Sequence, residues 1–274
     1  MNYYKYSIKV AEDLREVVLA FLSQLPFDTF AEVPEGIEAF IAEKNTKAEL
    51  EVELNSLASQ FSFEWKKEQI PDQNWNALWE SNFEPIQVGG FCGIRADFHP
   101  PLQEVEYEII INPKMAFGTG HHATTHMMLQ MMEHENFQDK QVLDYGCGTG
   151  ILAIMAALLG ARTIDAVDIE EASYENTLEN MRINQVDNIQ VFHGTLAQIS
   201  GTDYDSILAN INRNVILESL PALYDKLVSN GNLFVSGFLA KDEKLLRTEA
   251  QKHGFIIDRQ LSKTDWICLK LLKR

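Results

Sequence analysis

The chain has 274 residues, of which 46% are hydrophobic and 10% aromatic, and its formal net charge is −17. This content excludes a disordered chain, and the length suits one large domain or a large domain with a small one. The acidic balance argues against direct nucleic-acid binding, which relies on clustered lysine and arginine. It either attracts a basic partner or simply keeps the protein soluble.

The sequence shows no sign of a membrane span, a signal peptide or a disulfide framework. The longest purely apolar run, Ile151 to Leu159, is much shorter than the roughly 20 residues of a transmembrane helix. The start of the chain lacks the basic stretch and apolar block of a signal peptide. The three cysteines, Cys92, Cys147 and Cys268, are widely spaced and form no CxxC pair. We therefore expect a cytoplasmic protein.

The first seventy residues have the pattern of a small α+β domain. Apolar and β-prone residues alternate with stretches of helical spacing. The predicted elements are, in chain order, a strand over 3–10, a helix over 11–25, strands over 27–33 and 36–41, a helix over 46–59 and a strand over 61–70. This order is that of the ferredoxin-like split unit, so we predict a ferredoxin-like domain over residues 1–70.

Residues 71–90 are predicted to be a linker with a short helix. Pro71 breaks the preceding pattern, and Trp75 to Phe83 has its large apolar side chains on roughly one face. This piece is either a linker helix between two domains or an ordinary core helix. The second domain is predicted over residues 91–274 and begins with strand-like pieces at 91–96 and 106–111.

From Gln141 onward, strands and helices alternate. Strands are predicted at 142–145, 164–168, 189–193, 206–210 and 232–235, and helices at 151–159, 174–184, 214–228 and 241–253. Such alternation predicts a Rossmann-like α/β domain, with a parallel sheet covered by helices on both faces. Two final strands, 255–259 and 266–271, are separated by too few residues for a parallel crossover. This last pair should be antiparallel.

The strongest chemical signal is a glycine loop at a strand-to-helix junction, DYGCGTG over residues 144–150. Glycines there allow a sharp turn and close approach of the main chain to a ligand. Asp168 ends the next strand, about 20 residues on, where an acid accepts hydrogen bonds from ribose hydroxyls. The dinucleotide fingerprint GxGxxG would need a third glycine where Ile151 stands, so the pattern favours a nucleoside without phosphates.

Three alternative roles for this loop stay open on the residues alone. It could be a tight turn that binds nothing, part of a nicotinamide-dependent dehydrogenase, or part of a non-catalytic binding protein that has kept the fold. The missing third glycine argues against the dehydrogenase. The intact Gly146, Gly148, Gly150 and Asp168 argue against a protein that has lost its ligand.

The glycine loop and its flanks resemble the class I S-adenosylmethionine-dependent methyltransferases, which have seven strands. The block NPKMAFGTGHHATT over residues 112–125 is similar to the segment just upstream of this loop in the ribosomal protein L11 methyltransferase family, PrmA type. Ala209-Asn210-Ile211, and the Trp75 to Phe83 stretch leading into Pro85-Ile86, are similar as well. The resemblance covers most of residues 72–274.

The resemblance implies that S-adenosylmethionine is the methyl donor and assigns its contacts. The implied cofactor-binding residues are Thr125, Gly146, Gly148, Asp168 and Asn210. Asp168 is expected to hold the ribose, Gly146 to pass close to the methionine end, and Thr125 to help close the pocket. The glycine-rich Phe117 to Gly120 segment is expected to act as a lid.

The histidines near this block suggest a metal site, but their spacing argues against one. His122 and His126 are four residues apart on a possible helix, but the zinc-protease pattern HExxH would need Glu where Ala123 stands. We expect no metal, although His121 or His122 could line the acceptor site. Cys147 is expected to be a small packing residue.

The predicted function is methylation of the α-amine and lysine amines of ribosomal protein L11, as the resemblance implies. The resemblance also implies that the amino-terminal domain recognises this protein, and the acidic surface suits a basic ribosomal partner. Alternatives are a methyltransferase acting on another protein or on a small-molecule amine. Ala209-Asn210-Ile211-Asn212 stands where methyltransferases of planar nitrogens have Asn/Asp-Pro-Pro-Tyr/Phe. This difference favours a tetrahedral amine.

Overall fold

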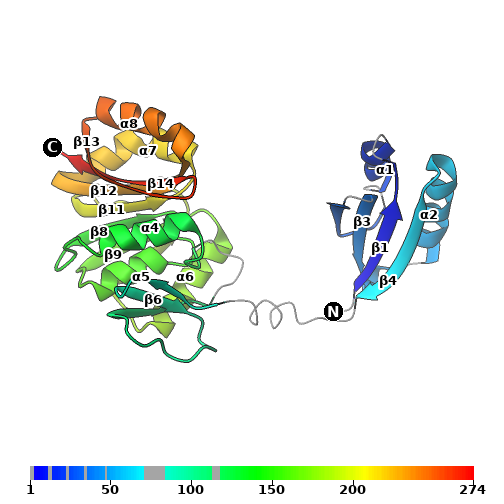
Figure 1. Ribbon diagram of the computed structural model, residues 1–274, viewed down its shortest axis with the longest axis horizontal. Helices are drawn as coiled ribbons and strands as arrows, with labels where there is room; N and C mark the ends of the chain where they lie inside the picture. The colour runs from blue at the N-terminus through cyan, green and yellow to red at the C-terminus, as the bar shows by residue number, and fades with distance from the viewer. Residues whose placement is uncertain are drawn as a thin grey trace. The chain divides into compact units, whose positions relative to one another are not determined.

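The chain forms two compact units, Met1–Phe83 and Glu84–Arg274 (Figure 1). A computed structural model describes residues 3–11, 14–22, 25–33, 36–46, 48–70, 84–112 and 118–274. The helix predicted over Trp75 to Phe83 lies outside these residues. The predicted linker 71–90 differs from the structure at its end, because β5 (Ile86–Val88) pairs with β6 (Cys92–Arg95) inside the second unit.

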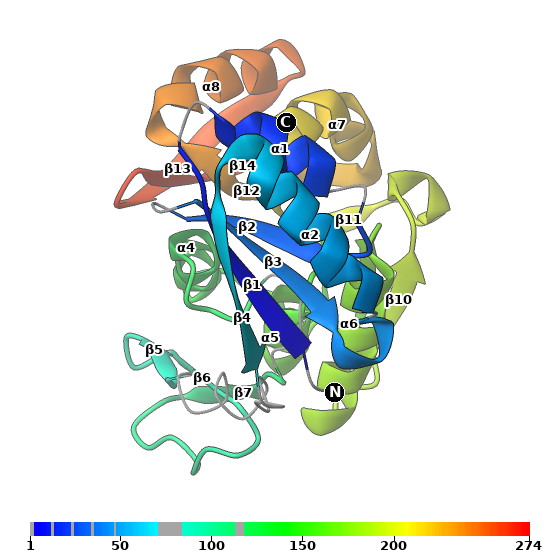
Figure 2. The same ribbon diagram turned by 90° about the vertical axis from the view of Figure 1, so that its right-hand side faces the viewer.

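The first unit follows the β-α-β-β-α-β order predicted from the sequence. Its elements are β1 (Tyr3–Lys9), α1 (Arg15–Leu22), β2 (Thr29–Val33), β3 (Gly36–Ala42), α2 (Ala48–Phe61) and β4 (Glu64–Ile70), with a short 3₁₀ turn at Glu43–Asn45. The strands form an antiparallel sheet in the order β2-β3-β1-β4. Figure 2 shows α1 and α2 lying together on one face of this sheet.

Alternation along β1 directs its apolar side chains to the face that α1 and α2 cover. Successive side chains of a strand point to opposite faces. Tyr6 and Ile8 are buried in the core that α1 and α2 complete. Lys5 lies on the other face, where its Nζ is 3.1 Å from a carboxylate oxygen of Glu38 and 3.5 Å from one of Glu68.

The second unit is built on a seven-stranded sheet in the order β10-β9-β8-β11-β12-β14-β13. The strands are β8 (Gln141–Tyr145), β9 (Thr163–Asp168), β10 (Ile189–His193), β11 (Tyr204–Asn210), β12 (Leu227–Leu239), β13 (Phe255–Lys263) and β14 (Trp266–Lys273). Neighbours from β10 to β12 pair in parallel, whereas β14 is antiparallel to both β12 and β13. The predicted Rossmann-like fold and the antiparallel final pair are confirmed.

Helices cover both faces of this sheet (Figure 1). They are α4 (Ala123–Met132), α5 (Ile151–Leu158), α6 (Glu171–Ile183), α7 (Arg213–Lys226) and α8 (Glu243–Lys252). Val142 of β8 packs into the same core as Met128 of α4, whereas the next residue, Leu143, packs into the opposite core with Leu220 of α7. Within the described part of the chain, no helix is long and apolar enough to cross a membrane.

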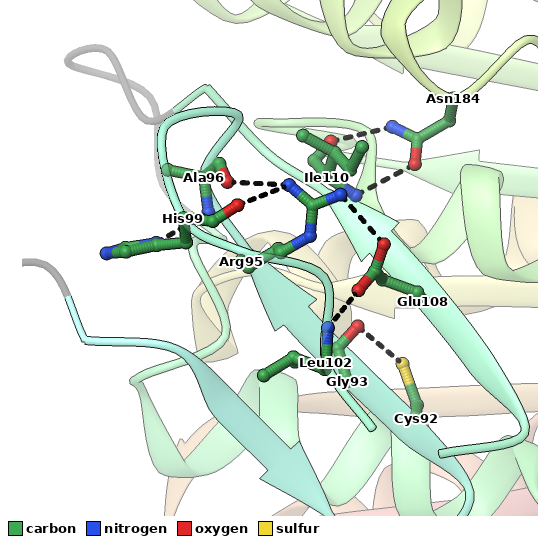
Figure 3. A network of polar contacts seen from close by, with 9 residues as sticks. All are labelled: Cys92, Gly93, Arg95, Ala96, His99, Leu102, Glu108, Ile110 and Asn184. Atoms are coloured by element: carbon green, nitrogen blue, oxygen red, sulfur yellow. Dashed lines mark hydrogen bonds and ion pairs between the residues drawn. The ribbon is translucent and has the colours of Figure 1, made fainter. Parts of the chain in front are cut away.

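A small sheet of β5, β6 and β7 (Tyr107–Ile110) precedes the large one. β6 and β7 are parallel, and the loop between them is held by the buried Arg95 (Figure 3). Its guanidinium donates to Glu108 at 2.9 Å and to the carbonyl oxygens of Ala96 and His99 at 3.1 Å each. These bonds connect a loop without regular structure to the strands on either side.

Candidate cofactor-binding site

A cavity of about 650 Å³ opens at the carboxyl edge of the parallel strands. Ligands of open α/β sheets bind at this edge where the strand order reverses, here between β8 with its neighbour β9 and β11 on the other side. The ends of three strands contribute lining residues: Tyr145 and the glycine loop after β8, Asp168 of β9 and Asn210 of β11.

The glycine loop runs from β8 into α5 in a conformation that needs glycine. Gly146, Gly148 and Gly150 have φ of 79°, 56° and 78°, a region that other residues rarely adopt. A Cβ at Gly146 would lie 2.1 Å from the side chain of Ile211. The loop therefore packs directly against the residue that follows Asn210, and Gly146 and Gly148 line the cavity.

The carboxylate of Asp168 is fixed by two main-chain donors. The N–H of Gly148 donates to Oδ2 at 2.9 Å, and the N–H of Glu170 donates to Oδ1 at 3.0 Å. Hydrogen bonds to a charged acceptor are stronger than neutral ones, so the carboxylate is held in one orientation at the cavity wall. Each oxygen keeps lone pairs that can accept from ligand hydroxyls.

Asn210 lines the cavity at the end of β11, and Thr125 of α4 lies next to it. The Asn210 Nδ2 donates to Thr125 Oγ1 at 3.2 Å. The carbonyl oxygen Oδ1 of Asn210 is buried and has no hydrogen-bond partner in the described chain. Leaving a buried acceptor unpaired costs about 1–3 kcal/mol, so this atom is a candidate acceptor for a ligand N–H.

The structure brings all five predicted residues together, with one in a different position from the others. Gly146, Gly148, Asp168 and Asn210 line the cavity. Thr125 is fully buried and is not among the lining residues. It reaches the cavity only through its hydrogen bond with Asn210.

Asp144 lies beneath the loop as a buried acid. Its Oδ2 accepts from the N–H of Ala153 at 3.0 Å in the first turn of α5, while Oδ1 has no partner among the described residues. Burial raises the pKa of this carboxyl to about 7; the bond from Ala153 opposes the shift, and the charge of Asp168 adds to it. Asp144 is therefore partly protonated near neutral pH.

Two aromatic side chains that line the cavity, His122 and Trp266, were not among the predicted cofactor-binding residues. His122 caps α4, with its Nδ1 accepting from the N–H of Thr124 at 3.3 Å, and its ring meets that of Trp266 edge-to-face at 4.7 Å. Both rings line the cavity, as the sequence allowed for His122. Trp266 was missed because a tryptophan at the start of a hairpin strand carries no local signal of a site.

The remaining candidate residues are not among those that line the cavity. His121 and His126 are not among the lining residues. The described residues contain no cluster of three or more His, Cys, Asp or Glu that could hold a metal. Burial raises the pKa of the Cys147 thiol, whose sulfur lies 3.4 Å from the Thr177 hydroxyl. Of the expected lid, Phe117 lies outside the described residues.

Comparison with known proteins supplies the family. The family model of ribosomal protein L11 methyltransferase (PrmA) matches residues 16–274. A protein named ribosomal protein L11 methyltransferase from Phocaeicola vulgatus is 36% identical, over 96% of this chain and 95% of its own. One from Bacteroides fragilis is 35% identical, over 99% and 100%.

A solved structure agrees with these relatives. The crystal structure of a ribosomal protein L11 methylase from Lactobacillus delbrueckii subsp. bulgaricus has a TM-score of 0.63 and is 28% identical, covering 70% of this chain and all of its own. The chain is an S-adenosylmethionine-dependent methyltransferase, and it belongs to the ribosomal protein L11 methyltransferase (PrmA) family.

Proposed function

We propose that this protein transfers methyl groups from S-adenosylmethionine to the α-amine and lysine amines of ribosomal protein L11, in the cytoplasm. The relatives' names supply the acceptor protein. The proposal rests on the polar groups at the edge of the cavity. There, a carboxylate held by two N–H groups and an asparagine with an unpaired buried oxygen lie on either side of the glycine loop.

The lining residues fit the methyl donor by chemical type. In the proposal, Asp168 accepts from the ribose hydroxyls, and the main chain at Gly146 and Gly148 packs against the donor. Asn210 Oδ1 accepts an N–H from the donor, since no described residue provides one. Thr125 keeps the Asn210 side chain in its orientation and makes no direct contact. The bound donor supplies a methyl group on a sulfonium, which is already activated for transfer.

The task left to the protein is to align an acceptor amine and to keep it neutral. Alignment alone can contribute about 7–11 kcal/mol. A lysine amine has an ordinary pKa near ~10.4 and an α-amine near ~7.7–8.0, and removal from water lowers both because it disfavours the charged form. The apolar surfaces of Ile211 and Trp266 at the cavity supply such an environment. No dedicated base is needed.

The first unit is proposed to recognise the protein acceptor. A small amine has little use for a separate domain. A net charge of −17 suits a basic ribosomal protein and disfavours direct contact with nucleic acid. A chain lacking residues 1–70 should therefore bind the donor and fail to methylate L11. Methylation at the full rate would instead favour a small-molecule amine or another acceptor.

The decisive experiment is intact-mass measurement of purified L11 after incubation with the enzyme and S-adenosylmethionine. The proposal expects additions of one or more methyl masses on amines, and an unchanged mass would refute it. Calorimetry of donor binding tests the site separately. Asp168→Ala should weaken donor binding by about 1–3 kcal/mol, the usual scale for hydrogen bonds to a charged group. An unchanged affinity would remove Asp168 from the site.

A further inference from the structure

Helix α6 and its C-cap residue carry a row of amide side chains, of which Asn176 and Asn180 are buried and Asn180 reaches the glycine loop. Asn176, Asn180 and Asn184 follow one another at intervals of four residues, so they share one face of the helix. Asn176, Thr177 and Asn180 are fully buried. Buried amides need partners, and here the partners are main-chain groups of segments far away in the sequence.

Asn180 joins two of these segments through a single carboxamide. Its Oδ1 accepts from the N–H of Asn112 at 2.9 Å, and its Nδ2 donates to the carbonyl oxygen of Thr149 at 2.8 Å. Thr149 lies in the glycine loop, and Asn112 lies two residues after the end of β7. The two segments are therefore connected by one side chain in the interior.

Neighbouring side chains extend the same connection. Asn176 donates to the carbonyl oxygen of Asn112 at 2.9 Å, and Thr177 donates to that of Gly148 at 2.9 Å. The hydroxyl of Thr149 donates to the carbonyl oxygen of Gly118 at 2.7 Å. The glycine loop is thus held from the side of α6 as well as by Asp168.

We propose that Asn180 is a positioning residue for methyl-donor binding, which acts by fixing the glycine loop before the donor arrives. A loop with three glycines at positive φ has high conformational entropy when it is not held. If the protein orders the loop in advance, the donor does not bear that cost on binding. The inference rests on the proposed donor site, although Asn180 is not among the residues lining the cavity.

Asn184 offers a matched control on the same helix. Its Nδ2 donates to the carbonyl oxygen of Ile110 at 2.6 Å, and the N–H of Ile110 donates to its Oδ1 at 2.8 Å (Figure 3). Like Asn180, it ties α6 through main-chain bonds to the segment that contains the end of β7. None of its bonds in the described chain reaches the glycine loop.

The test compares N180A and N184A with the wild type. Calorimetry measures the Kd for S-adenosylmethionine, steady-state kinetics measure the KM for the donor and for L11 separately, and urea unfolding measures stability. We expect both variants to lose stability. Only N180A should raise the donor Kd and the donor KM, by up to about tenfold, the scale of the one neutral hydrogen bond that joins Asn180 to the loop, with the KM for L11 unchanged. N184A should keep both donor constants within about twofold.

Equal changes in donor affinity for the two variants, or none in N180A, would overturn the inference. If N180A does not fold, N180S removes the same carboxamide with a smaller cavity, and a donor Kd within twofold of the wild type would then overturn it. Failure of the wild-type protein to bind the donor is a different result, because it refutes the proposed donor site itself.

Discussion

Replacing Gly237 by alanine should damage both the fold and the cavity. Gly237 lies in β12 at φ +96°, where the pairing with β14 shifts register, and it lines the cavity. A Cβ there would lie 2.1 Å from the carbonyl oxygen of Ile211 and 2.8 Å from its carbonyl carbon. Both atoms are main chain, so no side-chain rotation relieves the contact. Ile211 must move, and it also lines the cavity beside Asn210.

The expected size follows from two separate costs. The left-handed backbone region costs a non-glycine residue about 1–2 kcal/mol. Overpacking a closely packed site costs typically ~1–3 kcal/mol more. G237A should therefore lose about 2–5 kcal/mol of unfolding free energy. It should also weaken donor binding, since the displaced Ile211 packs against Gly146.

An alanine substitution at Gly89 is the control, because it carries the conformational cost without the steric one. Gly89 has φ +58°, but a Cβ there would meet nothing within 4 Å. G89A should therefore lose only the conformational part, about 1–2 kcal/mol, and bind the donor normally. Urea unfolding of both variants and calorimetry of donor binding make the comparison. Equal stability losses, within about 0.5 kcal/mol, would refute the steric reasoning at Gly237.

Three further predictions concern single polar groups. The pKa of Asp144 rises from 3.8 to about 7 on folding, so the folded chain binds the extra proton and stability should fall as pH rises through that window. D144N should remove up to about 2.7 kcal/mol of that fall between pH 5 and pH 8, as measured by urea unfolding, because about two pH units of the window lie in that range. An unchanged pH dependence would contradict the prediction. T125V keeps the shape of a buried residue but loses the hydrogen bond from Asn210, so kcat/KM should drop about fivefold. Full activity would show that this bond does not contribute to catalysis. The bond from Arg95 holds the pKa of Glu108 below its usual range, so its stabilising effect is present at neutral pH and lost as pH falls. E108Q should lose about 2 kcal/mol at pH 7 and less in acid, with donor affinity unchanged; a loss independent of pH would rule out the ion pair as its cause.

The sequence predicts most of the second unit because its signals are local. The glycine loop, the strand before it and the acid ending the next strand lie within 30 residues of one another, and their spacing alone indicates a nucleoside site. The antiparallel final pair follows from the short connection between the strands. Asp168, Gly146 and Gly148 could therefore be named before any fold was known.

Other features depend on partners that are distant in the sequence. β5 has only three residues and exists because it pairs with β6. β12 begins at Leu227, earlier than the predicted 232, because Leu227 pairs with Tyr204 of β11. A threonine in a helix gives no sign that it supports Asn210 from behind, and Trp266 becomes a site residue only when the hairpin folds against α4.

The glycine loop itself explains why the missed residues matter. Glycines allow the main chain to approach a ligand closely, but they leave the loop without side chains to hold it in place. Other elements supply the restraint: the N–H groups of Gly146 and Cys147 donate to the carbonyl oxygen of Val167. Three side chains also bond to main-chain groups of the loop, those of Asp168, Thr177 and Asn180. Of these three, only Asp168 lines the cavity. The motif thus predicts where the donor binds, while two of the three side chains that bond to the loop, Thr177 and Asn180, lie on α6, outside the motif.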